Sequence, residues 1–200
     1  MRIRTHTNPF NYATPMPPLD LQEIFPGYGG DLDVEIGFGR GFFLREWAKK
    51  HPERHMIGVD VRKHIVPLAE QKAILEGVQN VKWLHGNGEI FLRDALPESC
   101  IQRLFVFHPD PWLKKTHHKR RLINAKFLEL AKRSIKPGGH LYLSTDVKDL
   151  WDYMQVEIQA FKGFGLSEDI DFWQNEYRTE WHDLSHQRDR PLLRAAFIRN

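Results

Sequence analysis

The sequence has 200 residues with a formal net charge of +3, and apolar residues make up 41% of it. This length suits one domain with a substantial core, and the apolar content indicates an ordered globular protein rather than a disordered one. No apolar run approaches the ~18 residues of a membrane span, and no apolar stretch behind the first six residues resembles a signal peptide. The single cysteine, Cys100, excludes an intramolecular disulfide and a Cys-rich metal site, so we expect a soluble cytoplasmic protein.

The positive charge is concentrated in one segment. Residues 114–121 read Lys-Lys-Thr-His-His-Lys-Arg-Arg, with five formal positive charges and no acid. Taking these five charges from the net +3 leaves −2 for the rest of the chain. A patch of this kind predicts a polyanionic partner such as a nucleic acid.

In chain order, residues 1–31 are rich in Pro, Gly, Asn and Tyr, so we expect an irregular arm ahead of a single domain over residues 32–200. Apolar alternation and one continuous apolar run predict strands at Leu32–Ile36, His55–Asp60, Val81–His85, Ile101–Phe107, His140–Ser144 and Ala195–Ile198. Helical spacing and Gly or Pro stops predict helices at Phe42–Lys50, Lys63–Glu76, Gly88–Ala95, Lys119–Ser134 and Val147–Phe161.

Strands that alternate with helices at this spacing predict an α/β fold with a mostly parallel sheet and helices on both faces. Ligands of such sheets bind beyond the carboxyl ends of the strands. The functional residues are therefore expected just after the predicted strands, which is where the unusual residues of this chain stand.

A glycine-rich turn connects the first predicted strand to the first predicted helix. It reads Glu35-Ile36-Gly37-Phe38-Gly39-Arg40-Gly41, an E-x-G-x-G-x-G pattern rather than the G-x-G-x-x-G of dinucleotide-binding loops. The glycines allow a tight turn that brings a ligand to the helix N-terminus. Asp60 is placed to accept hydrogen bonds from ribose hydroxyls, and Asn87 could bond an adenine edge. A purely structural turn with Asp60 as a helix cap is the alternative.

A rigid loop follows the fourth predicted strand. It reads Pro109-Asp110-Pro111-Trp112, and the two prolines fix the backbone around the Asp110 carboxylate at the cofactor end of the sheet. Trp112 either stacks on a base or packs the loop.

The glycine turn, the Pro109–Trp112 loop with its basic continuation, and Ser144-Thr145-Asp146 together resemble the bacterial tRNA (guanine-N7-)-methyltransferase family of the TrmB type. The resemblance runs from Leu32 to Tyr153 and resumes near Thr179. It implies a Rossmann-like class I methyltransferase fold, S-adenosyl-L-methionine as cofactor, and N7 of a guanosine in tRNA, position 46, as the methyl acceptor.

The resemblance also assigns roles to single residues. It implies cofactor binding by Glu35, Gly37, Gly39, Gly41, Asp60, Asn87 and Asp110. Asp110 is also implied as the catalytic residue, and substrate binding is implied for Lys114, Asp146, Thr179 and His182. Asn87 stands where many relatives have Asp. His182 stands where the family's T-x-[FY]-E motif has its acid, which puts the details of guanine recognition in question.

Guanine N7 carries an exposed lone pair, so the expected reaction is an in-line displacement that mainly needs alignment. We therefore expect Asp110 to act by position and charge, either holding the N1–H and amino group of the base or offsetting its new positive charge. Lys115, Lys119, Arg120 and Arg121 are expected to contact phosphates. Cations at the start of a helix oppose its macrodipole, which favours this role over a solvated helix start.

Three other readings stay open. One is an amino-directed nucleic-acid methyltransferase with an [ND]-P-P-[YFW] motif, which Asp110-Pro111-Trp112 nearly matches. The second is an NAD(P)-dependent dehydrogenase, which the missing third glycine of G-x-G-x-x-G disfavours. The third is a non-catalytic RNA-binding protein of the same fold, which only His182 favours. No metal site is expected, because His108, His117 and His118 have no second ligand cluster at a recognisable spacing.

Overall fold

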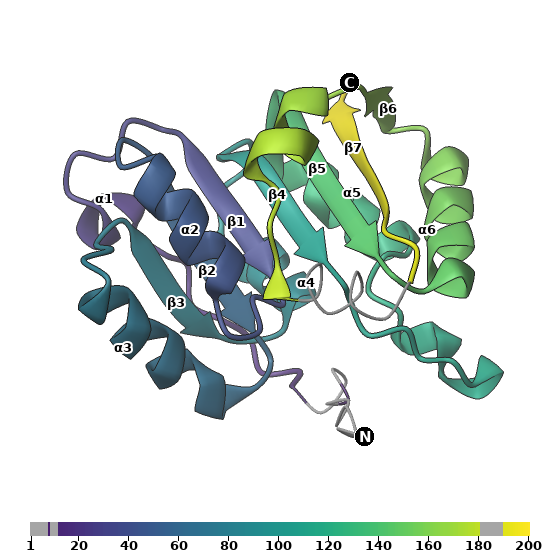
Figure 1. The fold of residues 1–200 in the computed structure, drawn as a ribbon, viewed down its shortest axis with the longest axis horizontal. Helices are drawn as coiled ribbons and strands as arrows, with labels where there is room; N and C mark the ends of the chain where they lie inside the picture. Colours follow the sequence, from purple (N-terminus) through teal and green to yellow (C-terminus); the bar gives the residue numbers. More distant parts are fainter. Residues whose placement is uncertain (1–7, 9–11, 181–189) are drawn as a thin grey trace.

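The computed structural model describes residues 8, 12–180 and 190–200, and within these residues the strands form one seven-stranded sheet in the order β3-β2-β1-β4-β5-β7-β6 (Figure 1). The strands are β1 (Leu32–Ile36), β2 (His55–Asp60), β3 (Val81–His85), β4 (Ile101–Phe107), β5 (Ile135–Thr145), β6 (Phe164–Ser167) and β7 (Leu193–Arg199). Strands β1 to β5 pair in parallel, and β7 runs antiparallel between β5 and β6. The predicted α/β class with a mostly parallel sheet is confirmed.

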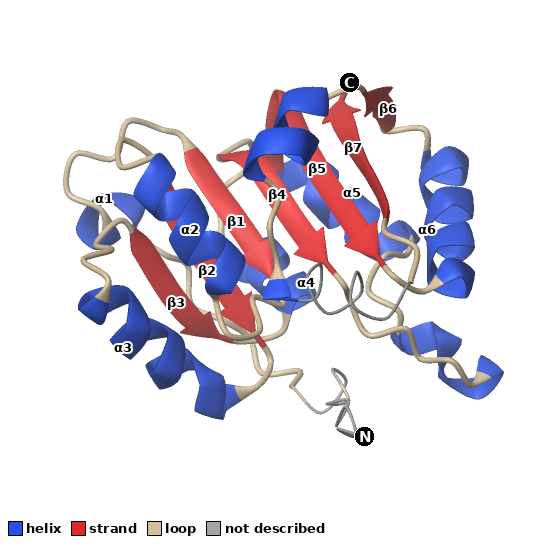
Figure 2. Cartoon of the chain, in the orientation of Figure 1, coloured by secondary structure: helices blue, strands red, loops and turns tan. Residues whose placement is uncertain are grey.

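Helices lie on both faces of the sheet (Figure 2). The α-helices are α1 (Leu21–Ile24), α2 (Phe42–Lys50), α3 (Val66–Leu75), α4 (Gly88–Ile90), α5 (Ala125–Ser134) and α6 (Lys148–Phe161). Shorter 3-10 or π turns are η2 (Lys63–Ile65), η3 (Phe91–Ala95), η4 (Lys115–Arg120) and η5 (Phe172–Glu176). Helices α2 and α3 cover one face, and α5 and α6 cover the other (Figure 1).

The core consists of two apolar layers, one on each face of the sheet. Strand β4 shows the division: Leu104 and Val106 belong to the layer beneath α5 and α6, whereas Phe105 and Phe107 belong to the layer beneath α2. All four side chains are buried, as the continuous apolar run predicted. Because β4 lies between β1 and β5 and is covered on both faces, its carboxyl end is a fixed platform for the loop that follows.

Two boundaries differ from the prediction. The expected turn at residues 136–139 is a bulge inside β5, because Ile101 pairs with Ile135 whereas Arg103 pairs with His140. Helix α5 begins only at Ala125, where the Asn124 side chain accepts from the Phe127 backbone N–H. The predicted helix start at residue 119 is therefore wrong, and so is the argument that the basic run opposes that helix's macrodipole.

The described part of the N-terminal arm packs on the domain. Leu21 and Phe25 are buried in the layer beneath α5 and α6, and Asp20 caps the short helix α1. The Leu19 backbone N–H donates to the Ala95 carbonyl at 2.9 Å. The hydrophobic core thus includes side chains from the segment predicted as an N-terminal arm.

Candidate cofactor and substrate pocket

A large pocket opens at the carboxyl ends of the parallel strands. Its volume is about 1090 Å³, just above the usual range for small-molecule sites. The predicted site residues that line it are Glu35, Gly37, Gly39, Asp60, Asn87, Asp110, Lys119, Arg120, Arg121 and Thr179. The strand order turns around β1, with β2 on one side and β4 on the other, so the pocket lies where α/β sheets bind their ligands.

The glycine turn between β1 and α2 adopts backbone angles that favour glycine. Gly37, Gly39 and Gly41 have φ values of 82°, 60° and 69°. Gly41 does not line the pocket: a Cβ there would lie 2.7 Å from the Trp83 ring, because helix α2 starts hard against β3 at this point. Gly41 therefore serves helix packing, and its predicted contact with the cofactor has no support in the geometry.

Glu35 is a buried carboxylate at the end of β1 that faces the pocket. Its Oε2 has no hydrogen-bond partner among the described residues. Burial, together with the nearby Asp60 carboxylate, raises the pKa of Glu35 to about 8. A buried acid without a partner is costly unless a cation or a donor from a ligand completes it.

Asp60 ends β2 and is also buried. Its Oδ2 accepts from the Gly39 backbone N–H at 3.1 Å, and its Oδ1 accepts from the Arg62 backbone N–H at 2.9 Å. The Arg62 guanidinium bonds both carboxylate oxygens at 3.1 Å. Asp60 therefore holds the glycine turn as well as facing the pocket, so the structural and cofactor readings of this residue are compatible.

Asn87 follows β3 and caps helix α4. Its Oδ1 accepts from the Glu89 backbone N–H at 2.9 Å, and the residue lines the pocket. The cap fixes the orientation of this side chain at the edge of the pocket.

The loop after β4 is rigid, and Asp110 lies on it half-buried. His108 and Trp112 flank the loop with φ values of 48° and 41°, in the left-handed region. Trp112 is only 8% exposed, and the Arg120 guanidinium lies 5.0 Å from its ring centroid. Trp112 therefore packs against the loop, and because it also lines the pocket, stacking on a base stays a prediction.

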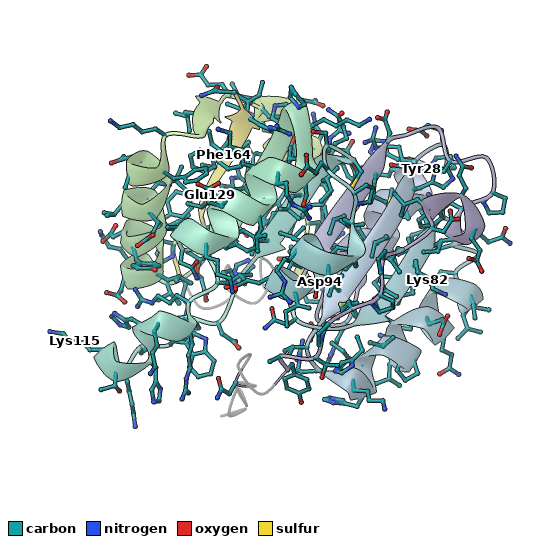
Figure 3. All side chains as sticks on the ribbon, turned by 180° about the vertical axis from the view of Figure 1, so that it is seen from behind. Tyr28, Lys82, Asp94, Lys115, Glu129 and Phe164 are labelled. Carbon is teal, nitrogen blue, oxygen red and sulfur yellow. The ribbon has the colours of Figure 1, made fainter. Side chains whose placement is uncertain are left out.

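The basic segment forms η4, which projects from the body of the molecule and carries Lys115 (Figure 3). Lys114, Lys115 and Lys119 are exposed, and Lys119 and Arg120 also line the pocket. An exposed row of cations that leads into a pocket suits a phosphate backbone next to a bound nucleotide.

Arg121 has a different environment from the one predicted. Its guanidinium is buried, donates to the Pro111 carbonyl at 3.0 Å, pairs with Asp149, and lies 4.9 Å from the Tyr153 ring centroid. These contacts close the loop from Pro111 to Arg121 at its base. We therefore withdraw Arg121 as a phosphate contact and assign it to loop structure.

Of the remaining predicted substrate residues that the structure describes, only Thr179 lines the pocket. Thr179 is buried and lines the pocket. Asp146 follows β5 and is buried; contact with His108, and a bond from Arg190 at 3.0 Å, hold the pKa of Asp146 well below its ordinary value. Lys114 does not line the pocket, and His182 lies outside the described residues.

Sequence reasoning missed several residues around the pocket. Arg62 stands two residues after a strand-end acid, a spacing that allows a short-range ion pair, and this was the available signal. His108 was considered only as a metal ligand. Tyr177 lies in a stretch with no predicted element, and nothing in the pattern pointed to it.

Within the described ranges, no group of three His, Cys, Asp or Glu side chains is arranged to hold a metal ion. In the same part of the chain, no helix combines the length and the apolar character needed to cross a membrane.

Comparison with known proteins shows which family has this fold. A protein-family model described as "Putative methyltransferase" matches residues 31–192. The 16S rRNA methyltransferase KamB has a TM-score of 0.62 at 17% identity, covering 90% of this chain and 92% of that chain. The aminoglycoside resistance methyltransferase NpmB1 gives 0.59 at 19% identity, with the same coverage. Fold and pocket position thus define a methyltransferase of the Rossmann-like α/β class.

Two curated relatives are more specific. The tRNA (guanine-N(7)-)-methyltransferase of Shewanella putrefaciens is 38% identical over 147 residues, covering 74% of this chain and 61% of that protein. The same enzyme of Nitrosococcus oceani is 34% identical over 168 residues, covering 76% of this chain and 71% of that protein. The chain belongs to the tRNA (guanine-N(7)-)-methyltransferase family. Its match to the Shewanella relative spans about three fifths of that protein's length.

Proposed function

We propose that this protein transfers a methyl group from S-adenosyl-L-methionine to N7 of a guanosine in tRNA, with position 46 as the expected target. The observation that carries the proposal is the joint position of three features. The glycine turn with Glu35, the Asp110 loop and the exposed cations of η4 all meet at one pocket. Membership of the family supplies the particular substrate.

The pocket residues fit the proposed cofactor. Glu35 has a buried oxygen without a partner among the described residues, and the ammonium group of an amino-acid moiety would complete it. Asp60 and Asn87, at the ends of β2 and β3, suit the ribose hydroxyls and the adenine edge. When bound, S-adenosyl-L-methionine supplies a methyl group on a sulfonium centre that a nitrogen lone pair can attack.

The protein's own contribution is alignment. Guanine N7 needs no deprotonation, so the chain must hold the base in line with the methyl group and keep water out. Asp110 lines the pocket, on a loop held by two prolines and by the hydrogen bond from Arg121 to Pro111. We assign it to hold the guanine edge or to offset the positive charge that forms on the base.

Lys115, Lys119 and Arg120 are proposed to contact tRNA phosphates, with Lys114 beside the bound guanosine. Such contacts orient the RNA and carry no sequence information. Thr179, which lines the pocket, and Asp146, which contacts His108, remain proposed substrate residues.

The test is transfer of labelled methyl from S-adenosyl-L-methionine to an unmodified tRNA transcript, followed by nucleoside analysis of the digest. Label in 7-methylguanosine is the expected result. A transcript with adenosine at position 46 is the matched control and should take up no label. Label in another nucleoside would contradict the proposed acceptor, and cofactor binding without transfer would favour a non-catalytic RNA-binding protein.

A further inference from the structure

His108 is a buried histidine that no step of the proposed reaction uses. It directly follows β4 and precedes Pro109 and Asp110, and its side chain is 1% exposed. Its φ of 48° lies in the left-handed region, which His, Asn and Asp tolerate better than most side chains. Its backbone N–H donates to the Ser144 carbonyl at 2.8 Å. The imidazole is therefore fixed at the root of the Asp110 loop.

One ring nitrogen of His108 reaches the segment that carries Thr179. Nε2 lies 3.0 Å from the Tyr177 hydroxyl, which in turn donates to Ser144 Oγ at 2.9 Å. The Thr179 side chain is hydrogen-bonded to the same hydroxyl, and burial raises the pKa of Tyr177 to about 12. The Tyr177 hydroxyl thus connects His108 at the end of β4 and Ser144 near the end of β5 with Thr179, which lines the pocket.

The other ring nitrogen faces Asp146. Nδ1 lies 3.6 Å from Asp146 Oδ1, and Oδ2 of the same carboxylate accepts from Arg190 at 3.0 Å. His108 therefore stands between two proposed substrate residues, Thr179 through Tyr177 on one side and Asp146 on the other. All of these contacts involve buried groups except the partly exposed Arg190.

We propose that His108 is a positioning residue for methyl transfer: through Tyr177 and Asp146 it holds the Asp110 loop in register with Thr179, so that two residues that line the pocket, Asp110 and Thr179, contact the guanine together. This inference rests on the proposed function. An in-line displacement is sensitive to small errors of alignment, and a buried network of hydrogen bonds and an ion pair favours one arrangement of the segments it joins. A network that served stability alone would lack this link to turnover.

The test removes the hydrogen bond between His108 and Tyr177 by changing each of the two residues in turn. His108→Asn keeps a residue that tolerates the left-handed backbone but is too short to reach Tyr177. Tyr177→Phe removes only the hydroxyl. We expect each variant to lower kcat about tenfold or more, with KM for S-adenosyl-L-methionine within about twofold of the wild type. The double variant should lose no more than the worse single variant, because both changes remove the same link.

Tyr142→Phe is the matched control. It also removes a buried tyrosine hydroxyl, one that donates to Asp169 at 2.6 Å, and Tyr142 does not line the pocket. Its kcat should stay at the wild-type value even if its stability falls. Wild-type kcat in Tyr177→Phe, or losses that simply multiply in the double variant, would overturn the proposal.

A second readout does not depend on turnover. Amide hydrogen exchange at residues 107–112 and 177–180 should speed up together in Tyr177→Phe and stay unchanged in Tyr142→Phe. If the wild type transferred no methyl group, the proposed function would fail while this measurement still decided the inference. Unchanged exchange in both segments of Tyr177→Phe would contradict the link.

Discussion

Glu35 combines burial, a raised pKa and an oxygen without a partner among the described residues. In the unfolded chain this carboxyl ionises near its ordinary value of 4.5, whereas in the folded protein it does so at about 8. Between these values the folded state binds more protons than the unfolded state. Its contribution to stability is therefore intact below pH 4.5 and is lost as the pH rises towards 8.

Replacing Glu35 by Gln should remove this pH dependence. We expect the wild-type free energy of unfolding to fall by several kcal/mol relative to Glu35→Gln between pH 5 and pH 8. Urea titrations without cofactor across this range measure the difference. Excess S-adenosyl-L-methionine should shrink it for the wild type, because an ammonium group favours the ionised carboxylate; a constant difference would contradict the assignment of Glu35.

A substitution at Asp110 can distinguish the effect of its charge from the effect of its position. Asp110→Asn keeps the shape of the side chain and removes its charge, so single-turnover methyl transfer should slow by about 10- to 100-fold. Binding of S-adenosyl-L-methionine, measured by calorimetry, should change less than the rate does. A variant that methylates at nearly the wild-type rate would rule out a major role for the charge.

At the scale of single residues, the sequence predicted which side chains at the strand ends would line the pocket. Glu35, Asp60, Asn87 and Asp110 were predicted because parallel strands gather their carboxyl ends. The burial of Arg121 could not be predicted. Whether a cation in a basic run is exposed or buried depends on its partners elsewhere in the fold, which here are Pro111, Asp149 and Tyr153.

At the scale of elements, η4 predicts a salt-dependent affinity. The double variant Lys115→Ala, Lys119→Ala should weaken tRNA binding and lower the slope of log affinity against log salt by about 2. Lys82→Ala is the control, since Lys82 is exposed on β3, far from η4 (Figure 3). An unchanged slope in the double variant, measured by filter binding between 50 and 300 mM salt, would contradict phosphate contact.

The elements that the sequence predicted well are those whose signals are local. Strands β1 to β4 and helix α2 follow from alternation, apolar runs and Gly or Pro stops. The bulge in β5 and the short strand β6 did not emerge, because each depends on pairing with a distant segment: β4 for the bulge and β7 for β6. The start of α5 was missed because Asn124 caps it within a stretch that also continued the apolar spacing.

At the scale of the whole molecule, stability and chemistry lie at opposite ends of the sheet. Asp33, near the start of β1, is fully buried, and its carboxylate accepts from Trp47 Nε1 at 2.9 Å and from Arg54 at 2.6 Å twice. Asp33→Ala would leave the partly buried Arg54 guanidinium without this ion-pair partner, and we expect the free energy of unfolding to fall by ~3–5 kcal/mol. The rate per folded molecule should stay unchanged, because the pocket lies at the other end of β1.

Thermal unfolding and active-site titration of the same preparation test this separation. Asp31→Ala is the control, since Asp31 forms an exposed ion pair with Lys136. We expect it to cost less than about 1 kcal/mol. A loss of activity per folded Asp33→Ala molecule would show that the two ends of the sheet are coupled.

The position of β7 has a consequence for how the chain is made. Residues 193–199 insert between β5 and β6, although β6 precedes them in the chain by more than twenty residues. During synthesis, β1 to β5 can pair as they emerge, while β6 has no neighbour in the sheet until β7 arrives. A nascent chain stopped at residue 192 should therefore keep β6 open to protease while β1 to β4 resist it. The seven-stranded sheet of the described residues is therefore completed only after β7 has been made.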